Sequence, residues 1–578
     1  MSLDFLHTVR HLRPSQVLWR LRYAAERRAR AALGSPQTHL WHRSKPPVVR
    51  EDLPIVPKLR SPGLGVEDLA QGNVELLNTR FELGLAKPDW RLGERATDRL
   101  WTVTLHYHEW LEALAESNQR RARPELGIKL IRHYLSDWIR RCAINQPGSL
   151  ALAWNAYAIA TRLGWWARMY QHSDYQLFGT RPVFEAQFLR SFWQQASYLN
   201  AHLEWDLRGN HLMRDALGLA WAGRFFEGSQ PSLWLKRATD LAVGQAAEQI
   251  LADGGHFERS PGYHVEIMED LLTLALLVET REARAELTQA WAAMAEYLAW
   301  LRHPDGDIPL FNDAALRGAE KVVAALDQGR WIGVSIDPSP RQGGRVFADT
   351  GMVVWHGPRW TLFFDVGPVG PDYQPGHAHA DNLSLECSFQ GQRLFVDPGS
   401  ICYDEDDRRR YDRSTAAHNT VCIDDTDSSD MWKIFRVGRR ARPHDVSCDL
   451  HTHGLQAEGS HDGYDRLPGR PYHRRRVSVQ EDGPLRIEDY VAGSGDHRVQ
   501  GGLLVAPTWQ VENTNDGWRL ASGELRVNVS LSSPQPVTRY RESRPYHPAY
   551  GVEQSATRIG WRWQGALPVE VHTVVEPS

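Results

Sequence analysis

The stretch "GHAHADNLSLECSFQGQRLFVDPGS", residues 376–400, places two histidines one residue apart and ends with a carboxylate before Pro-Gly. In an extended segment, residues i and i+2 point to the same face, so His377 and His379 would present two imidazoles side by side. Neighbouring imidazoles can bind a metal or transfer protons. The bare pattern is common, however, and Asp397 before Pro-Gly is a good turn former. The stretch is therefore either a site or a capped, packed piece of sheet.

Three other stretches concentrate polar side chains, and each also has a purely structural interpretation. "WDLRGNHLMRDALGLA" places Asn210 and His211 at a helix start, where Asn210 could be an N-cap. "DGGHFERSPGYHVEIMEDLL" places Tyr263 just after Ser-Pro, a normal helix entry, and the tyrosine could be a packed aromatic. "RRRYDRSTAAHNTVCIDD" contains His418, which could satisfy a buried strand end. The residue types alone leave both interpretations open.

Two hydrophobic periods divide the chain that must position these residues. From about residue 98 to 330, apolar residues recur at three/four spacing, which predicts a long series of paired helices. From about 344 the period is two, which predicts strands joined by polar turns. Helices followed by strands indicate two segregated domains. We predict a basic N-terminal helical arm and connector over 1–95, an α/α toroid over 96–335 and an antiparallel β-sandwich over 336–578.

Composition narrows the class of protein. The 578 residues carry a net charge of −4, which gives no general attraction to nucleic acid. The 23 tryptophans could stack on sugar rings, but large core residues explain most of them. The cysteine count is odd and no CxxC occurs, so we expect reduced thiols without a disulfide framework or a cysteine zinc site. They are Cys142, Cys387, Cys402, Cys422 and Cys448.

The N-terminus is basic. Residues 1–50 hold ten Lys or Arg and two acidic residues, with Leu18 and Leu21 among the arginines. An amphipathic helix in peripheral contact with an anionic membrane would have this pattern, and so would a helical arm packed on the protein body. The start of the chain lacks the apolar core of a signal peptide, and no apolar run is long enough to span a membrane. We expect a cytoplasmic protein, with export by another route left open.

In combination, these stretches resemble the heparinase II/III family of polysaccharide lyases from about residue 95 onward. The resemblance is carried by "GNH", "DGGHFERSPGYH", "DGDIPLFND", "GHAHADNLSLECSFQGQRLFVDPGS" and "YDRSTAAHNTV". It implies an incomplete α/α toroid followed by an antiparallel β-sandwich, in agreement with the change of period. It also implies an acidic polysaccharide substrate that is cleaved by β-elimination next to a uronic acid.

The resemblance implies a role for each candidate residue. Asn210 and His211 would hold the uronate carboxylate, since an amide and an imidazole at a helix start suit an anion. Tyr263 would be the acid, and for one substrate stereochemistry also the base. His377 would be a second acid/base group. His379, Asp397 and His418 would bind a metal, and a His/Asp/His set suits a structural zinc.

Two other function classes remain. A glycoside hydrolase on the same helical scaffold would need two opposed carboxylates, for which Glu258 and Asp253 are the nearest candidates, although they look like groups that cap a loop. A non-catalytic glycan-binding or exopolysaccharide assembly protein could keep the fold without the acid. The sequence does not name the polymer.

Overall fold

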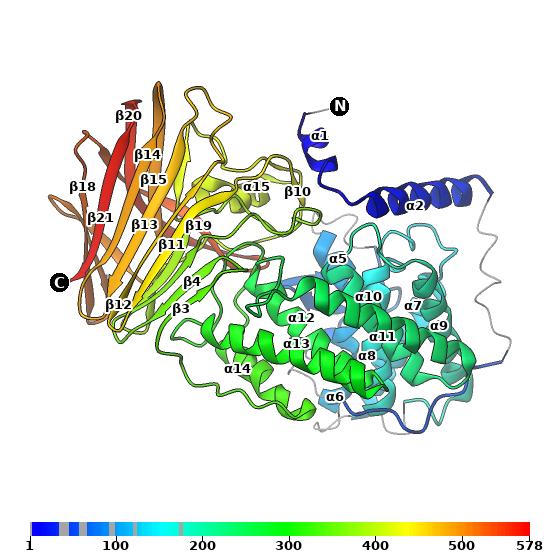
Figure 1. The fold of residues 1–578 in the computed structure, drawn as a ribbon. Helices are drawn as coiled ribbons and strands as arrows, with labels where there is room; N and C mark the ends of the chain where they lie inside the picture. The colour runs from blue at the N-terminus through cyan, green and yellow to red at the C-terminus, as the bar shows by residue number, and fades with distance from the viewer. Residues whose placement is uncertain (1–2, 34–44, 57–65, 92–98, 119–123, 173–176) are drawn as a thin grey trace.

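The computed structural model describes residues 3–33, 45–56, 66–91, 99–118, 124–172 and 177–578. A helical part comes first in the chain and a strand part second, and the two lie side by side (Figure 1). The chain begins with α1 (Leu3–Val9), α2 (Pro14–Leu33), α3 (Val66–Ala70), β1 (Asn73–Leu76) and β2 (Thr79–Glu82). The sequence predicts an irregular connector with short strands over residues 51–95; β1 and β2 are such strands, and the structure adds the short helix α3.

The helical part is a series of helices packed against their chain neighbours. They are α5 (Arg99–Leu105), α6 (Glu109–Asn118), α7 (Pro124–Arg141), α8 (Ala156–His172), α9 (Pro182–Ala201), α10 (Asn210–Phe225), α11 (Ser229–Gln249), α12 (Pro261–Leu277), α13 (Arg281–Trp300), α14 (Ala319–Asp327) and the short 3₁₀ helix η2 (Gln328–Ile332). Tryptophans such as Trp138, Trp166 and Trp291 are fully buried here, so core filling accounts for many of these aromatics, as predicted.

The strand part contains two antiparallel sheets whose facing apolar side chains form one core, including Leu385 and Val477. One sheet has the order β11 (Pro443–His451), β12 (Gly454–His461), β13 (Tyr472–Gln480), β14 (Leu485–Ala492), β21 (Val569–Pro577), β18 (Leu525–Ser532), β17 (Gly517–Ser522), β16 (Gln510–Asn513). The other has the order β19 (Thr538–Ala549), β20 (Val552–Ala566), β15 (Asp496–Val505), β7 (Gln392–Phe395), β6 (Leu385–Phe389), β5 (Trp360–Asp365), β4 (Met352–His356), β3 (Gly343–Phe347), with β8 (Val421–Ile423) paired to β15. The predicted order of a helical region followed by antiparallel sheets is confirmed.

Two local expectations from the sequence differ from the structure. The spacing in "DAALRGAEKVVAALD" predicts a helix from residue 313, but α14 begins only at Ala319, because the preceding segment runs irregularly. Residues 401–415 are expected to form a loop from their sequence, but they contain the helix α15 (Asp407–Arg413), which Asp406 caps by accepting a hydrogen bond from Arg409 N. Within the described ranges, the helices are too short or too polar for any of them to cross a bilayer.

The close packing of α8 on α10 yields a stability test. A Cβ added at Gly218 in α10 would lie 2.5 Å from Ala160 Cα in α8, so the helices would have to move apart. Gly218→Ala should therefore destabilise the protein by about 1–3 kcal/mol, the usual cost of overpacking. Gly244 in α11 has open space around it, and the same substitution there should be neutral or stabilise by about 0.5–1 kcal/mol. Thermal unfolding of the two variants measures the difference, and equal effects would contradict the packing.

Candidate active site

Asn210 opens α10, and a glycine before it makes room for a carboxylate. Gly209 has a φ of 58°, which suits glycine, and a Cβ there would lie 2.7 Å from Glu258 Oε1. This approach allows Asn210 N to donate to the same oxygen at 3.0 Å. Gly209, not Asn210, is the N-cap, so the interpretation of Asn210 as a helix cap is wrong. The Oδ1 atom of Asn210 is buried and finds no hydrogen-bond partner in the described part of the chain.

Tyr263 lies in the first turn of α12. Ser260 caps this helix by accepting a hydrogen bond from Tyr263 N at 3.2 Å, and Pro261 follows it, so the predicted helix entry is confirmed. The tyrosine ring stacks on His377 of the strand part, with ring centroids 3.7 Å apart and planes inclined by 29°. Tyr263 is thus packed, as its structural interpretation expected, but its partner is a titratable ring from the other half of the molecule.

A buried carboxylate, Asp313, fixes both histidines of the HxH stretch. Its two oxygens lie 3.0 Å from His377 Nδ1 and 3.0 Å from His379 Nε2. Ser400 Oγ donates to it at 3.0 Å, and both terminal nitrogens of the Arg409 guanidinium donate as well. Residues that follow Asp313 by 64 to 96 positions in the sequence therefore meet at its side chain.

The charge on Asp313 determines the tautomers of its neighbours. Burial alone would raise the pKa of Asp313, but Arg409 and the hydrogen bonds from the two histidines outweigh it and hold this pKa well below its usual range. An ionised carboxylate only accepts hydrogen bonds, so His377 Nδ1 and His379 Nε2 must be the donors. A neutral His377 then has its lone pair on Nε2, which lies 3.7 Å from Glu258 Oε2. A lone pair held in this way can accept a proton.

The environment of His211 favours the protonated, positively charged imidazole. Its Nδ1 lies 3.0 Å from Glu204 Oε2. Burial by itself would lower the pKa of His211, but the charge of Glu204 and its hydrogen bond outweigh burial, and the pKa is raised. The imidazole therefore keeps its positive charge to higher pH than an ordinary histidine. Beside Asn210, it offers a positive charge to an anionic group.

The environment of Tyr263 favours the neutral, protonated phenol. Burial raises its pKa well above the ordinary value, so the hydroxyl keeps its proton through the neutral range. Its oxygen lies 3.0 Å from the Tyr403 hydroxyl, which in turn lies 2.6 Å from the Tyr550 hydroxyl. The row of hydroxyls begins next to His377 and fixes the position of the Tyr263 oxygen.

His379, Asp397 and His418 lie together, fully buried, and each can offer one ligand atom within 4.8 Å of the other two. His418 Nδ1 lies 2.7 Å from Asp397 Oδ2. His379 Nδ1 and His418 Nε2 are buried without a hydrogen-bond partner among the residues that the structure describes. Two partnerless ring nitrogens beside a carboxylate fit a metal better than a packed core, since buried polar atoms are normally paired. The pairing of His418 with Asp397 replaces its interpretation as a strand-end group.

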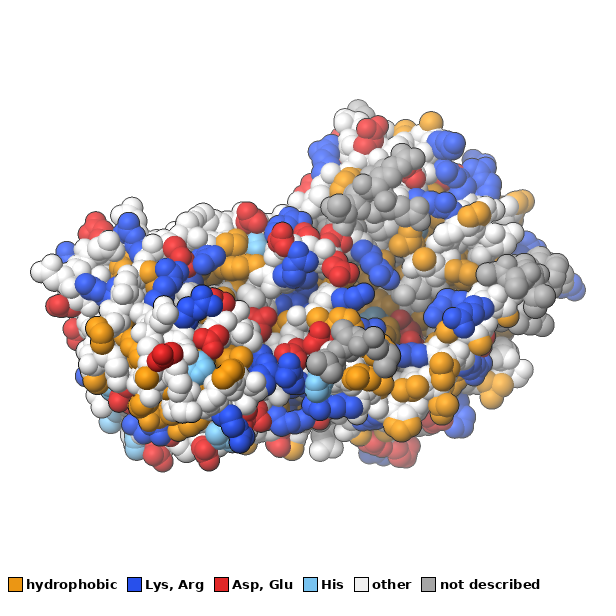
Figure 2. Space-filling model, turned by 90° about the horizontal axis from the view of Figure 1, so that it is seen from above, with side chains coloured by type: hydrophobic (Ala, Val, Ile, Leu, Met, Phe, Trp, Pro, Cys, Tyr) orange, Lys and Arg blue, Asp and Glu red, His pale blue; other side chains and the backbone are white. Residues whose placement is uncertain are grey.

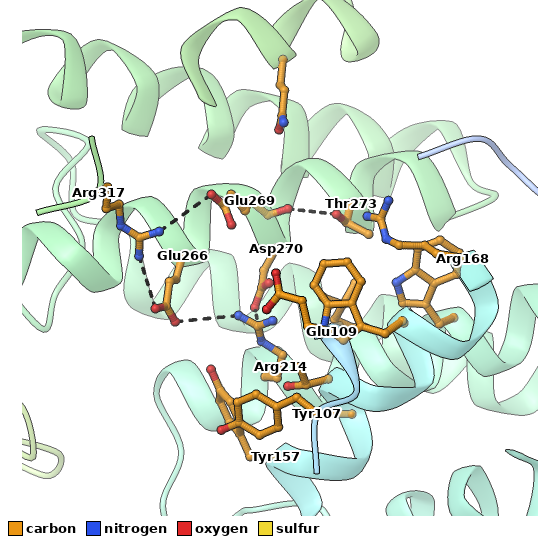
Figure 3. A pocket seen from close by; sticks show the side chains of 17 residues that line it. Tyr107, Glu109, Tyr157, Arg168, Arg214, Glu266, Glu269, Asp270, Thr273 and Arg317 are labelled. Atoms are coloured by element: carbon orange, nitrogen blue, oxygen red, sulfur yellow. Dashed lines mark hydrogen bonds and ion pairs between the residues drawn. The ribbon is translucent and has the colours of Figure 1, made fainter. Parts of the chain in front are cut away.

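A cavity of about 300 Å³ opens inside the helical part (Figure 3), and its lining does not include the predicted catalytic or metal-binding residues themselves. One face of each of the helices α8, α10 and α12 lines it, together with Tyr107, Glu109, Arg317 and Gln328. On α12, Glu266 and Asp270 follow Tyr263 at helical spacing, and on α10, Arg214 follows Asn210. On α8, Tyr157 lines the cavity and its ring centroid lies 5.0 Å from that of His211. The cavity therefore adjoins the candidate catalytic residues.

The dashed lines in Figure 3 join two arginines of the cavity wall, Arg214 and Arg317, to acidic side chains of α12. Arg214 Nε lies 3.0 Å from Asp270, and Arg317 lies 3.2 Å from Glu266 and 3.9 Å from Glu269. Burial raises the pKa values of Glu269 and Asp270 to about 7, despite the arginines. The wall thus offers sugar hydroxyls many hydrogen-bonding groups without a surplus of positive charge.

The two carboxylates considered for a hydrolase are engaged in structural bonds. Glu258 supports the start of α10 through Asn210 N. Asp253 accepts hydrogen bonds from Gly255 N at 3.0 Å and from Thr350 N and Oγ1, both at 2.7 Å. Both residues brace loops, which agrees with their expected capping character.

Sequence reasoning missed Asp313, Arg409 and Tyr403 as parts of this site. Asp313 stands in "DGDIPLFND", one of the stretches that carry the family resemblance, so a signal was present. Arg409 stands in "RRRYDRSTAAHNTVCIDD", another of the quoted polar stretches, whereas Tyr403 has no distinguishing local pattern. Only the fold brings them to Asp313 and Tyr263.

Comparison with known proteins assigns the chain to a family. A sequence model of the heparinase II/III N-terminus matches residues 79–332, and a model of the heparinase II/III-like C-terminal region matches residues 339–575. Together they cover most of the chain, which belongs to the heparinase II/III family.

Individual relatives are distant. A heparin-sulfate lyase of Bacteroides stercoris is 23% identical over 430 residues, covering 66% of this chain and 63% of that protein. FtsZ-localized protein C of Caulobacter vibrioides is 24% identical over 257 residues, covering 42% of this chain and 40% of that one. The matches thus span less than two thirds of these relatives. A crystal structure of heparinase III superposes with a TM-score of 0.77 at 17% identity, covering 98% of this chain and 92% of that one. This similarity shows an α/α toroid followed by a β-sandwich.

The charge on His211 can be tested without any substrate. Because the pKa of His211 is raised, the imidazolium is present below that pKa and is lost as pH rises through it. Glu204→Gln should lower the titration midpoint of His211, since burial is then unopposed by the carboxylate charge. Histidine-ring NMR titration measures it, with His211→Asn to assign the signal and Glu282→Gln on the exposed surface of α13 as control. An unchanged midpoint in Glu204→Gln would contradict the pairing.

Proposed function

We propose that this chain is a polysaccharide lyase that cleaves a uronate-containing polysaccharide by β-elimination. The observation that carries the proposal is the stack of Tyr263 on His377, a neutral phenol against an imidazole whose lone pair is oriented by Asp313. Asn210, whose buried Oδ1 has no partner among the described residues, is connected to this pair through Glu258, and the pKa of the next residue, His211, is raised by Glu204. Relatives named heparin-sulfate lyase support the same reaction class.

In the proposed reaction, a base removes the proton at C5 of the uronate. The electrons of that C–H bond form the C4–C5 double bond, the C4–O bond breaks, and the leaving oxygen takes a proton. Asn210 and His211 hold the carboxylate and stabilise the enolate-like charge that develops on it. His377, with its lone pair on Nε2, accepts the C5 proton. Tyr263, whose pKa is raised by burial, gives its proton to the leaving oxygen.

The cavity supports a substrate whose sugar on that side is unsulfated. A sulfate group would need a cation, but Arg214 and Arg317 already face Asp270 and Glu266. The third arginine of the lining, Arg168, donates to Val56 O at 2.7 Å. On the face seen in Figure 2, basic and acidic side chains are interspersed. We therefore propose that the polymer is recognised by its uronate and by ring contacts with aromatic residues such as Tyr157, not by sulfate.

Replacing the acid tests the proposed reaction. On whichever polymer of a panel is cleaved, with sulfated and desulfated forms compared, Tyr263→Phe should lower kcat by roughly 10²–10⁴, the usual worth of general acid–base catalysis. KM should change little because Asn210 and His211 remain. Ultraviolet absorbance of the unsaturated uronate measures turnover. Tyr464→Phe removes a buried hydroxyl bonded to Val421 O within the sandwich and serves as the control.

Near wild-type turnover in Tyr263→Phe would remove Tyr263 from the mechanism and leave His377 as the acid/base group. A preference for the sulfated form would contradict the substrate class inferred from the cavity.

We propose further that His379, Asp397 and His418 hold a structural zinc. The two partnerless ring nitrogens and the neighbouring carboxylate support it. Asp313, bonded to His379 Nε2, would orient that ligand, as carboxylates next to zinc-binding histidines do. Such a metal would supply a rigid cross-link between the segments around His379, Asp397 and His418, and none of the proton transfers above uses it.

Elemental analysis tests the metal. Protein purified without added metal should contain about one zinc per chain, and His379→Ala should lose it and melt at a lower temperature, because a metal bound only by the native state stabilises that state. His473→Ala removes a buried imidazole bonded to Asp489 elsewhere in the sandwich and should retain the zinc. Metal-free wild-type protein of unchanged melting temperature would contradict the proposal.

The outer face of α2 supports peripheral contact with an anionic membrane. Leu18 and Leu21 are 67% and 64% exposed, and arginines such as Arg22 and Arg28 lie on the same exposed face. Wild-type protein should sediment with vesicles that contain phosphatidylglycerol, less so at high salt. Ser at both leucines should weaken this, whereas Leu233→Ser, which alters an equally exposed leucine on α11, should not. Equal sedimentation of all three proteins would contradict the contact.

A further inference from the structure

The N-terminal arm, α1 and α2, contacts both halves of the molecule (Figure 1). In α1, Thr8 Oγ1 donates to Val437 O at 2.9 Å, on the short strand β10 (Arg436–Val437) of the strand part. In α2, Tyr23 OH donates to Leu203 O, and Trp19 stacks on Trp205 with centroids 6.3 Å apart. The second pair of contacts lies on the loop that leads into Asn210 and His211.

One side chain of the arm joins the two catalytic loops directly. Gln16 is fully buried, and its Nε2 lies 3.3 Å from Asp206 O, 3.4 Å from Leu207 O and 3.3 Å from Tyr373 O. Its Oε1 accepts a hydrogen bond from Arg13 N at 3.0 Å, which fixes the orientation of the amide. Asp206 and Leu207 precede Asn210 on the helical side, and Tyr373 precedes His377 on the strand side.

A second, charged connection runs through Glu248 of α11. Arg13 of the arm reaches this carboxylate at 2.8 Å, and Arg208, from the loop before Asn210, reaches it at 2.6 Å. The hydroxyl of Tyr373 donates to it at 2.5 Å, and the Arg13 guanidinium lies over the Tyr373 ring, 3.9 Å from its centroid. The same two loops and the same arm therefore meet twice, through independent side chains.

We infer that the N-terminal arm is a positioning element of the active site. Gln16 fixes the loop 203–209 relative to the loop 371–376. The first loop presents Asn210 and His211, and the second presents His377. The catalytic part of this inference rests on the proposed lyase function. The groups that hold the carboxylate belong to the helical part, and His377 belongs to the strand part. A shift of one loop against the other leaves substrate binding intact and separates the base from the bound uronate, and a misplacement of about 1 Å can cost roughly 10²-fold in rate.

Gln16→Met tests the inference, because methionine has a similar length but cannot donate to the three carbonyl oxygens. Hydrogen–deuterium exchange, which needs no substrate, should rise in segments 203–209 and 371–376 and stay unchanged in β13 and β14. On the cleaved polymer, kcat should fall by roughly 10–100-fold with KM within about twofold. Ser15→Ala, the exposed neighbour on the same helix, should match the wild type. Tyr373→Phe removes only the hydroxyl bond to Glu248 and should show a smaller change in the same direction.

Unchanged exchange in both loops of Gln16→Met would overturn the inference, and so would a rise in one loop alone. Increased exchange in both loops with an unchanged kcat would overturn the positioning role. If no polymer is cleaved even by the wild type, the lyase function fails, and the exchange measurement still decides whether the arm holds the two loops together.

Discussion

The site depends on one buried carboxylate. Asp313 has no exposed side-chain surface, and it is stabilised as an anion by the Arg409 guanidinium and by donors from His377, His379 and Ser400. A buried charge with one partner removed costs several kcal/mol, so the fold must bring these segments together in one arrangement. Because Asp313 stays ionised, both histidines donate to it. Their other ring nitrogens then point away from Asp313, that of His377 toward Glu258 and that of His379 into the group it forms with Asp397 and His418.

In the helical part, the starts of two helices position the site residues. Asn210 and Tyr263 stand at the starts of α10 and α12, and the faces of these helices then continue into the paired charges of the cavity. A reaction at this place therefore draws on both halves of the molecule, and their relative position must be fixed. Gln16 of the N-terminal arm fixes the relative position of the two parts at the loops 203–209 and 371–376. Asp313 fixes it at the buried centre of the site. The outer face of α2 remains exposed, so the proposed contact with a membrane and the proposed positioning of the loops would use opposite sides of one helix.

The change of hydrophobic period predicted the order of the two architectures, because periodicity is a local property of the chain. Ser260 and Pro261 likewise predicted the start of α12. Asn210 was open to misreading as a cap, since the sequence does not show that Gly209 takes a positive φ to admit Glu258. Tyr403 and Arg409 could not be found in advance, because their roles arise from contacts with residues 140 and 96 positions away in the sequence. Gln16 could not be found because its role arises from a buried position in a basic helix, in contact with residues at least 190 positions away. The roles of Asn210, His211, Tyr263 and His377 stay predictions.

The most direct test of the elimination mechanism is the mass of the products from a defined oligosaccharide of the cleaved polymer. Elimination adds no water, so the masses of the two fragments should sum to the mass of the parent, and one fragment should carry the unsaturated uronate. Hydrolysis would add one water for each cut, and the fragments would exceed the parent by that mass. Fragments that sum to the parent mass are the result this account predicts, and fragments heavier by one water would contradict it.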